Sequence, residues 1–238
     1  MKNTQIISVI NQKGGVGKTT TVINLATALS MNNKKVLVID LDPQGNATTG
    51  FGISNNDDTK TIYDVLNGNA NFEDTIKDTK IDNLQLVSSN VDLSGLEVET
   101  ANESRKAFLL KDKIENFINS TKNDFSYIFI DCPPSLSLLT IMSLVVAKSL
   151  IVPLQAEFFA LEGLSQLMQT IDRVKNKLNP TLEIRGVLLT MFDKRNKLST
   201  EVDWEARKFF KNKVYQTVIP RNVRLSEAPS YGTPVLIY

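Results

Sequence analysis

A stretch rich in lysine and glycine near the N-terminus, Lys13–Thr20 (KGGVGKTT), holds the residues best suited to chemistry. The apolar run Ile6–Ile10 before it predicts a buried strand, and Thr21–Ser30 after it predicts a helix. A glycine turn at such a junction can point several backbone N–H groups into one concavity, and the helix N-terminus adds partial positive charge. We therefore expect a polyphosphate ligand, with Lys18 at the β- and γ-phosphates and the Thr19 hydroxyl on Mg²⁺. A tight turn with a solvated lysine is the alternative. The expected phosphate-binding residues are Lys13, Gly14, Gly15, Val16, Gly17, Lys18, Thr19 and Thr20.

Two further apolar runs end in aspartates. The first leads into Asp40 and Asp42, and the second, Tyr127–Ile130, leads into Asp131 and two prolines. Ligands of open parallel sheets bind at the carboxyl ends of the strands, next to a phosphate-binding loop. The second run has a Walker B pattern, so we expect Asp131 to hold the Mg²⁺ shell through a water. Asp40 and Asp42 are expected to act on magnesium and water, although acidic turn residues before a proline would have the same pattern.

Composition limits the available chemistry. The 238 residues include no histidine and one cysteine, Cys132, which excludes Ser-His and Cys-His mechanisms, histidine metal ligation and an internal disulfide. Catalysis must then use carboxylates, lysines, hydroxyls and a bound metal. No apolar stretch is long enough to cross a bilayer, and the first strand follows almost directly on Met1, so we expect a cytoplasmic protein.

Charge is unevenly distributed, although the formal net charge is only +1. Residues 173–238 carry 13 Lys/Arg and 6 Asp/Glu, whereas residues 1–172 carry 14 and 20. A basic C-terminal quarter suits a polyanionic partner, but an ordinary solvated surface would carry the same charges.

The elements that must position these residues alternate between strand and helix. Expected strands are 6–10, 35–40, 84–87, 127–131, 150–153, 184–190 and 218–220, and expected helices are 21–30, 61–66, 105–120, 161–178 and 199–210. This alternation predicts an α/β fold with a mainly parallel twisted sheet and helices on both faces. We expect a single P-loop NTPase-like domain spanning residues 1–238.

Four motifs in order resemble the ParA/Soj branch of the ParA/MinD ATPases: K-G-G-V-G-K-T, D-L-D-P-Q-G-N-A-T, D-C-P-P and P-R-N-V-R-L-S-E-A-P. Where an ordinary P-loop has its first glycine this chain has Gln12, and the additional Lys13 makes the loop similar to the deviant Walker A motif. The resemblance implies ATP and Mg²⁺ as ligands and an ATP-dependent homodimer in which Lys13 reaches the partner's nucleotide. It also implies that Asp42 positions the attacking water and that Asp40 supports the metal shell.

The resemblance extends to the late segments. It implies that Pro220 and Asn222 lie by the adenine and that Arg195, Arg221 and Arg224 bind DNA without sequence preference, although Arg221 or Arg224 could instead hold the loop. It also implies that residues 155–163 pack near the dimer interface, unless they are only the start of an ordinary helix. Members of the family usually continue into a final helix beyond the position at which this sequence stops.

By this resemblance the chain is an ATP-driven DNA-partitioning ATPase. Its dimer would bind double-stranded DNA and release it on slow hydrolysis, stimulated by a ParB-type centromere-binding protein, in the cytoplasm and on the nucleoid. Two alternatives remain open. A MinD-like membrane-cycling ATPase would need a C-terminal amphipathic helix. A metabolic P-loop ligase or kinase of the dethiobiotin synthetase kind would use the same phosphate chemistry on a small substrate.

Overall fold

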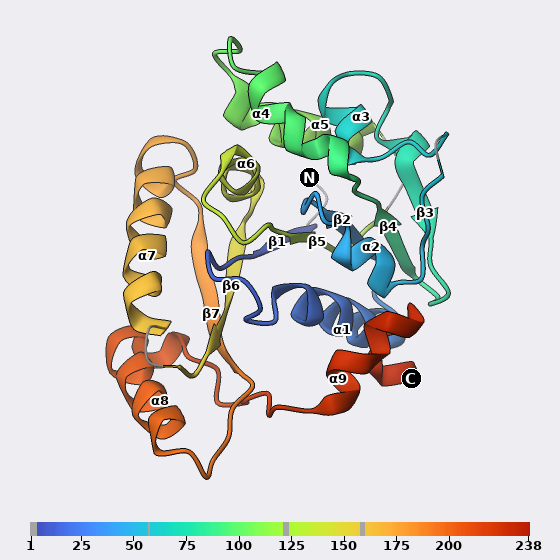
Figure 1. Ribbon diagram of the computed structural model, residues 1–238. Helices are drawn as coiled ribbons and strands as arrows, with labels where there is room; N and C mark the ends of the chain where they lie inside the picture. The colour runs from blue at the N-terminus through green and yellow to red at the C-terminus, as the bar shows by residue number, and fades with distance from the viewer. Residues whose placement is uncertain (1–3, 57, 121–123, 158–159) are drawn as a thin grey trace.

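A sheet of seven strands forms the centre of the computed structural model, which describes residues 4–56, 58–120, 124–157 and 160–238 (Figure 1). The strand order is β3-β4-β2-β5-β1-β6-β7, and neighbours are parallel except for the antiparallel pair β3 and β4. The expected mainly parallel α/β fold is confirmed. The strands are β1 (Gln5–Val9), β2 (Val36–Asp40), β3 (Ile76–Asp78), β4 (Leu84–Val87), β5 (Tyr127–Asp131), β6 (Ser149–Gln155) and β7 (Glu183–Thr190).

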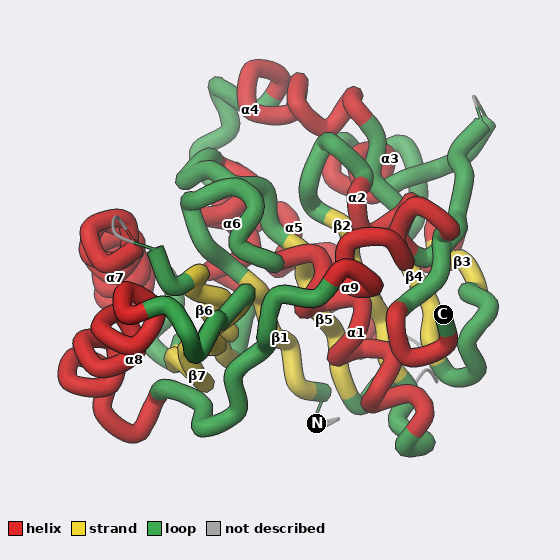
Figure 2. The backbone as a smooth tube through the Cα atoms, turned by 60° about the horizontal axis from the view of Figure 1, so that its bottom comes forward, coloured by secondary structure: helices red, strands yellow, loops and turns green. Residues whose placement is uncertain are grey.

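Helices cover both faces of the sheet. Because successive side chains of a strand point to opposite faces, Ile6 packs into a core cluster with α5 and α6, whereas Ile7 packs into a cluster with α1. A third cluster joins β6 and β7 to α7 and α8, which lie side by side in both views of the chain (Figures 1 and 2). The long helices are α1 (Lys18–Met31), α5 (Leu109–Ser120), α6 (Leu138–Val146), α7 (Ala160–Lys177) and α8 (Lys197–Phe210).

Shorter helices occupy the connections. They are α2 (Asn46–Gly50), α3 (Ile62–Leu66), α4 (Leu96–Glu99) and α9 (Val223–Glu227). Single 3₁₀ turns span Glu73–Thr75, Val91–Gly95, Lys106–Phe108, Lys211–Lys213, Ala228–Tyr231 and Val235–Ile237. In the described part of the chain, no helix combines the length and apolar character that crossing a membrane requires.

The expected strand at 218–220 is wrong. The segment after α8 runs beside β7 but makes only isolated bridges, Val187 with Val214 and Phe192 with Pro220. Its N–H groups at Tyr215 and Ile219 donate to the carbonyls of Val187 and Leu189 at 3.0 and 2.8 Å. Between these two hydrogen bonds β7 advances by two positions and the segment by four, so the segment loses register and no ladder forms.

Candidate functional site

The glycine loop joins the carboxyl end of β1 to the start of α1, beside the ends of β2 and β5. In the strand register Asp131 stands opposite Val9 on one side and opposite Asp40 on the other. Gly15 and Gly17 have φ of 74° and 90°, a left-handed conformation in which a side chain would be strained. Because Val9, Asp131 and Asp40 are in register, the glycine loop and the expected carboxylates lie together at the carboxyl ends of the adjacent strands β1, β5 and β2.

Lys18 is the first residue of α1 and is almost fully buried, at 6% exposed. Its Nζ donates to the carbonyl of Lys13 at 3.0 Å, so the loop wraps around its own lysine. Burial lowers the pKa of Lys18, while Asp131 and other acidic groups nearby act to raise it. Thr190 at the end of β7 fixes the loop from the other side, because its hydroxyl donates to the carbonyl of Val16 at 2.8 Å.

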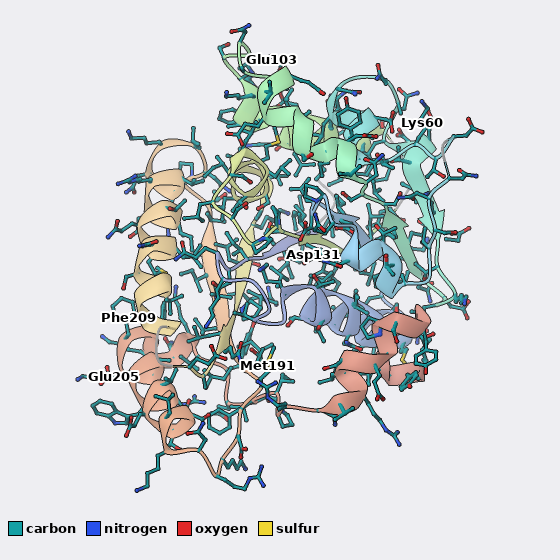
Figure 3. All side chains as sticks on the ribbon, in the orientation of Figure 1. Lys60, Glu103, Asp131, Met191, Glu205 and Phe209 are labelled. Carbon is teal, nitrogen blue, oxygen red and sulfur yellow. The ribbon has the colours of Figure 1, made fainter. Side chains whose placement is uncertain are left out.

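Asp131 lies at the centre of the molecule, as Figure 3 shows, and is fully buried. Neither of its carboxylate oxygens has a hydrogen-bond partner among the residues that the structure describes. Burial, and next the charge of Asp40, raise the pKa of Asp131 well above its ordinary value, and the Thr19 hydroxyl and Lys18 oppose this shift. The hydroxyl of Thr19 is thus close enough to favour the ionised carboxylate without completing a hydrogen bond.

These groups fit a magnesium ion. A buried carboxylate with no hydrogen-bond partner in the described ranges, beside a hydroxyl, offers the oxygen ligands that Mg²⁺ prefers. No group of three or more acidic, histidine or cysteine side chains in the described ranges could hold a metal by itself. Thr19 and Asp131 would therefore share the ion with phosphate oxygens and water.

Asp40 differs from Asp131 because both of its oxygens are engaged. Its Oδ2 accepts hydrogen bonds from the backbone N–H and the hydroxyl of Thr48, at 2.8 and 2.7 Å. Its Oδ1 accepts from the N–H of Asp42 at 3.2 Å, and Oδ1 of Asp42 accepts from the N–H of Gln44 at 3.0 Å. Burial raises the pKa of Asp40 to about 6, against the effect of these hydrogen bonds. Asp40 is thus tied to the loop that carries Asp42.

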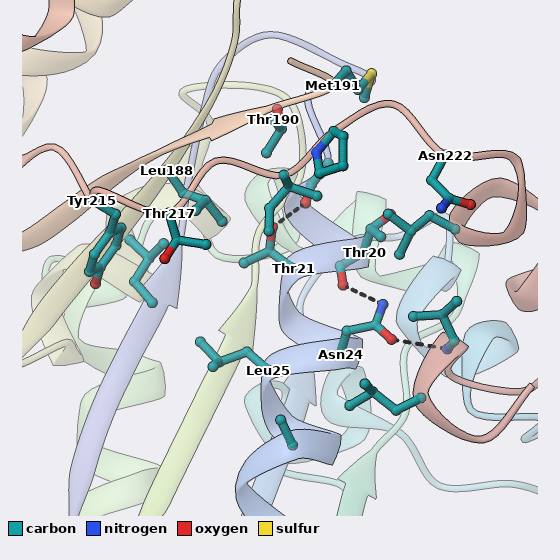
Figure 4. A pocket seen from close by; sticks show the side chains of 18 of the residues that line it. Thr20, Thr21, Asn24, Leu25, Leu188, Thr190, Met191, Tyr215, Thr217 and Asn222 are labelled. Carbon is teal, nitrogen blue, oxygen red and sulfur yellow. Dashed lines mark hydrogen bonds between the residues drawn. The ribbon is translucent and has the colours of Figure 1, made fainter. Parts of the chain in front are cut away.

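A cavity of about 730 Å³ opens beside the glycine loop (Figure 4). Gly17, Thr20, Pro220 and Asn222, all expected at the nucleotide, line it together with Asn24. Asn24 donates to the carbonyl of Thr20 at 2.9 Å and accepts from the N–H of Val235 at 3.0 Å, so the C-terminal segment forms one wall. An apolar cavity with a few polar groups is typical of a small-ligand site. The remaining lining is mainly apolar and includes Ile7, Leu25, Phe129, Ile151, Leu188 and Met191.

Lys13, the additional lysine, is held by Glu157 in the segment between β6 and α7. Their Nζ and Oε2 atoms are 2.5 Å apart, and the side chains are 39% and 45% exposed. Gln155 also donates to Glu157, and Gln12 donates to the carbonyl of Gly163 in α7 at 2.8 Å. The head of the loop is therefore bound to the segment that the resemblance places near a dimer interface. Residues 158 and 159 of that segment lie outside the described residues.

Comparison with known proteins identifies the family. A family model described as an AAA domain matches residues 4–184. The chromosome partitioning protein ParA of Caulobacter vibrioides is 51% identical, over 98% of this chain and 87% of its own length. The sporulation initiation inhibitor protein Soj of Bacillus subtilis is 49% identical, over 98% of this chain and 91% of its own length. The chain belongs to the ParA/Soj family.

This ParA/Soj-family chain is also similar to the solved structure of a protein with a different name. Cobyrinic acid a,c-diamide synthase from Mycobacterium smegmatis, with a bound ATP analogue and magnesium, has 34% sequence identity and a TM-score of 0.85. The match covers 92% of this chain and 86% of that chain. The P-loop NTPase-like fold is therefore confirmed.

The two late basic segments of this ParA/Soj-family chain lie side by side. The N–H of Phe192 donates to the carbonyl of Ile219 at 3.0 Å, and Phe192 bridges Pro220. This contact brings the loop of Arg195 next to the segment that begins with Arg221. The two basic segments therefore start from adjacent backbone positions, even though the sequence separates them.

The three arginines differ in their surroundings. Arg195 is 90% exposed in its side chain, and its Nε and Nη2 donate to the two carboxylate oxygens of Asp193 at 3.0 and 2.9 Å. This pairing lowers the pKa of Asp193 to about 2. Arg221 and Arg224 are exposed, and the side chain of Asn222 caps α9 by accepting from the N–H of Arg224 at 2.8 Å. Part of the charge of Arg195 is thus already offset within the chain.

Proposed function

We propose that this chain is an ATP-dependent DNA-partitioning ATPase. ATP joins two chains into a dimer that holds double-stranded DNA, and hydrolysis releases the DNA. The observation that carries this proposal is the convergence of the glycine loop, Lys18 and the unpartnered carboxylate of Asp131 at one edge of the sheet. It occurs in a chain that is 51% identical, over 98% of its length, to a protein named as a chromosome partitioning protein.

ATP and Mg²⁺ are the proposed ligands. The loop N–H groups and Lys18 would bind the phosphates, while Thr19 and Asp131 hold the metal. Magnesium, when bound, offsets the charge of the phosphate oxygens. Pro220 and Asn222 line the neighbouring cavity, where an adenine would lie. The bound ATP analogue and magnesium of the M. smegmatis structure support this choice of ligands.

Hydrolysis would depend on Asp42 and on a second chain. Asp42 is buried beside the phosphate loop and would position the attacking water. Lys13 of the second chain would reach across and offset the charge that develops on the transferred phosphoryl group, as an arginine finger does. Lys13 is bound to Glu157 within its own chain, so this contact has to open first.

The proposed DNA surface is formed by Arg195, Arg221 and Arg224. Adjacent basic segments suit contacts with phosphates, which position a protein on DNA without reading sequence. A dimer doubles the number of such contacts, so two weak surfaces become one tight site. A ParB-type centromere-binding protein is the proposed partner and activator, with the nucleoid as the place of action, and family membership supports both.

The test is binding to sequence-random duplex DNA without nucleotide, with ADP and with ATP, over a series of salt concentrations. We expect binding only with ATP, persistence in Asp42→Ala, and weakening in Arg224→Ala with a salt slope smaller by about 1 per chain. Arg105→Ala is the matched control, because this exposed arginine pairs with Asp112 of α5 and its loss changes the charge equally. DNA binding that ignores ATP would contradict the proposal.

A metabolic P-loop enzyme is the second candidate, because of the similarity to cobyrinic acid a,c-diamide synthase. Such an enzyme would consume ATP only with a small acceptor substrate and would be indifferent to DNA. ATP turnover that duplex DNA raises, with no acceptor present, therefore decides for the partitioning ATPase.

A further inference from the structure

The two buried aspartates at the ends of β2 and β5 have opposite surroundings, although they face each other in register. Asp131 has no hydrogen-bond partner in the described part of the chain, whereas three hydrogen bonds reach Asp40. An ionised carboxylate has about four acceptor sites, so Asp40 has little capacity left for a metal. Two of its three bonds come from Thr48.

Thr48 joins three separate parts of the fold. It belongs to α2, is 3% exposed, and donates through both its N–H and its hydroxyl to Oδ2 of Asp40. The same hydroxyl accepts from the N–H of Ser89, just beyond β4, at 3.1 Å. Ser89 is held in turn, because Asn55 donates to its carbonyl at 2.8 Å. The Thr48 hydroxyl thus links the end of β2 to the end of β4 as donor and acceptor at once.

The loop from Asp40 to Thr48 closes on itself around Asp42. The N–H of Asp42 donates to Asp40, and the N–H groups of Gln44 and Gly45 donate to the side chain and the carbonyl of Asp42 at 3.0 and 2.9 Å. Gly45 permits this turn with a φ of 64°. Because Asp42 at the start of the loop and Thr48 at its end both donate hydrogen bonds to Asp40, the carboxylate of Asp42 is held in a defined position.

We infer that Thr48 is a positioning residue for ATP hydrolysis, which holds Asp40 and through it the loop that presents Asp42. Asp40 is then the anchor of this loop, and Asp131 is the carboxylate that serves the magnesium. This inference rests on the proposed ATPase function.

Three variants test it. Thr48→Val keeps the shape of the side chain and the backbone N–H donor to Asp40, but it removes the hydroxyl that donates to Asp40 and accepts from Ser89. Thr48→Ser keeps the hydroxyl. Thr100→Val is the matched control, because Thr100 is also 3% exposed and its hydroxyl donates to a backbone carbonyl, that of Leu96, at 2.7 Å, outside the site. Each variant is assayed for kcat, for KM of ATP and for magnesium requirement, well below its unfolding temperature.

Thr48→Val is expected to lower kcat by about tenfold or more, with KM for ATP changed by less than about threefold. Its magnesium requirement is expected to stay that of the wild type, because the inference assigns the metal to Asp131 and not to Asp40. In the nucleotide-free protein, amide exchange at Ser89 and Asp42 accelerates about tenfold or more, since both lose part of their support. Thr48→Ser and Thr100→Val keep the wild-type kcat within about twofold.

Wild-type kcat in Thr48→Val would overturn the inference, as would an equal loss in Thr48→Ser. An increased magnesium requirement in Thr48→Val with unchanged exchange at Asp42 would also overturn it, because Asp40 would then act on the metal. Failure of the proposed function is a different result: the wild-type chain itself would not hydrolyse ATP, with or without DNA.

Discussion

Asp131 is a fully buried carboxylate with no hydrogen-bond partner among the residues that the structure describes. Such a group favours its protonated form, and its pKa is raised together with that of Asp40, which reaches about 6. The folded state then binds more protons than the unfolded state between the unfolded and folded pKa values. The contribution of such a carboxyl group to stability is fully present below this pH window and is lost as pH rises through it. For Asp40 the window runs from 3.8 to about 6. The site is therefore a source of instability at neutral pH until a cation occupies it.

Asp131→Asn is accordingly expected to raise the free energy of unfolding of the nucleotide-free protein at pH 7, by on the order of 1–3 kcal/mol. It should also flatten the decline of stability with pH and abolish magnesium-dependent ATP hydrolysis. Urea unfolding in EDTA between pH 4.5 and pH 8 measures the first effect. Asp58→Asn, at an exposed carboxylate, is the control and should leave the curve unchanged. A variant less stable than the wild type at pH 7 would refute this account of Asp131.

The residues of the glycine loop and Asp131 are predictable because their spacing is local and follows a strand that is itself evident from sequence. The contacts that fix them are not. Thr190 reaches Val16 across 174 positions, and Ser89 reaches Thr48 across 41. A threonine whose hydroxyl forms a hydrogen bond with a backbone atom far along the chain lies in no local sequence pattern. Sequence analysis therefore cannot distinguish it from the other threonines.

At the scale of elements, the strands of the sheet are predictable because continuous apolar runs are typical of buried parallel strands. α6 is not among the expected helices because nearly all of its side chains are buried, so it lacks the amphipathic pattern that marks α5 and α8. β3 has three residues, too few for a pattern. The connections between elements depend instead on backbone contacts, as the turn after α2 illustrates.

Gly52 in that turn has a φ of 71°, and a Cβ there would lie 2.8 Å from the carbonyl oxygen of Gly232. Gly68 has a φ of 86°, but a Cβ there would meet no non-neighbouring atom of the described residues within 4 Å. Gly68→Ala should therefore cost about 1 kcal/mol of unfolding free energy, from backbone strain alone. Gly52→Ala should cost at least about 1 kcal/mol more, because a backbone atom must move. Urea unfolding of the two variants measures the difference, and equal losses would mean that the contact with Gly232 contributes nothing.

At the scale of the whole molecule, one segment would contact both proposed ligands, the nucleotide and DNA. Residues 217, 219–222, 225 and 226 line the cavity beside the glycine loop, and this stretch carries both Arg221, which is itself part of the lining, and Arg224. β7 holds the glycine loop through Thr190 and this segment through the carbonyl of Leu189. A nucleotide that fills the cavity therefore touches the segment that would contact DNA, which is a direct physical route from ATP binding to DNA affinity.

Dimerisation is the remaining step of the proposed cycle, and the ion pair between Lys13 and Glu157 is expected to oppose it. The pair between Lys13 and Glu157 is half exposed, so it adds at most about 1 kcal/mol to the fold. Lys13 has to leave this pair before it can reach the partner's nucleotide. Glu157→Gln, in an Asp42→Ala background that prevents hydrolysis, should therefore lower the concentration at which ATP and Mg²⁺ induce the dimer by about two- to tenfold.

Sedimentation over a dilution series measures this midpoint, and unfolding stability should stay within about 0.5 kcal/mol of the parent. Glu97→Gln, at an exposed acid on α4, controls for the change of charge. In a Lys13→Ala background the effect of Glu157→Gln should vanish, because the two residues act through one contact. A midpoint that stays the same or rises in Glu157→Gln would show that Glu157 does not restrain Lys13, and that it contributes instead to the interface itself.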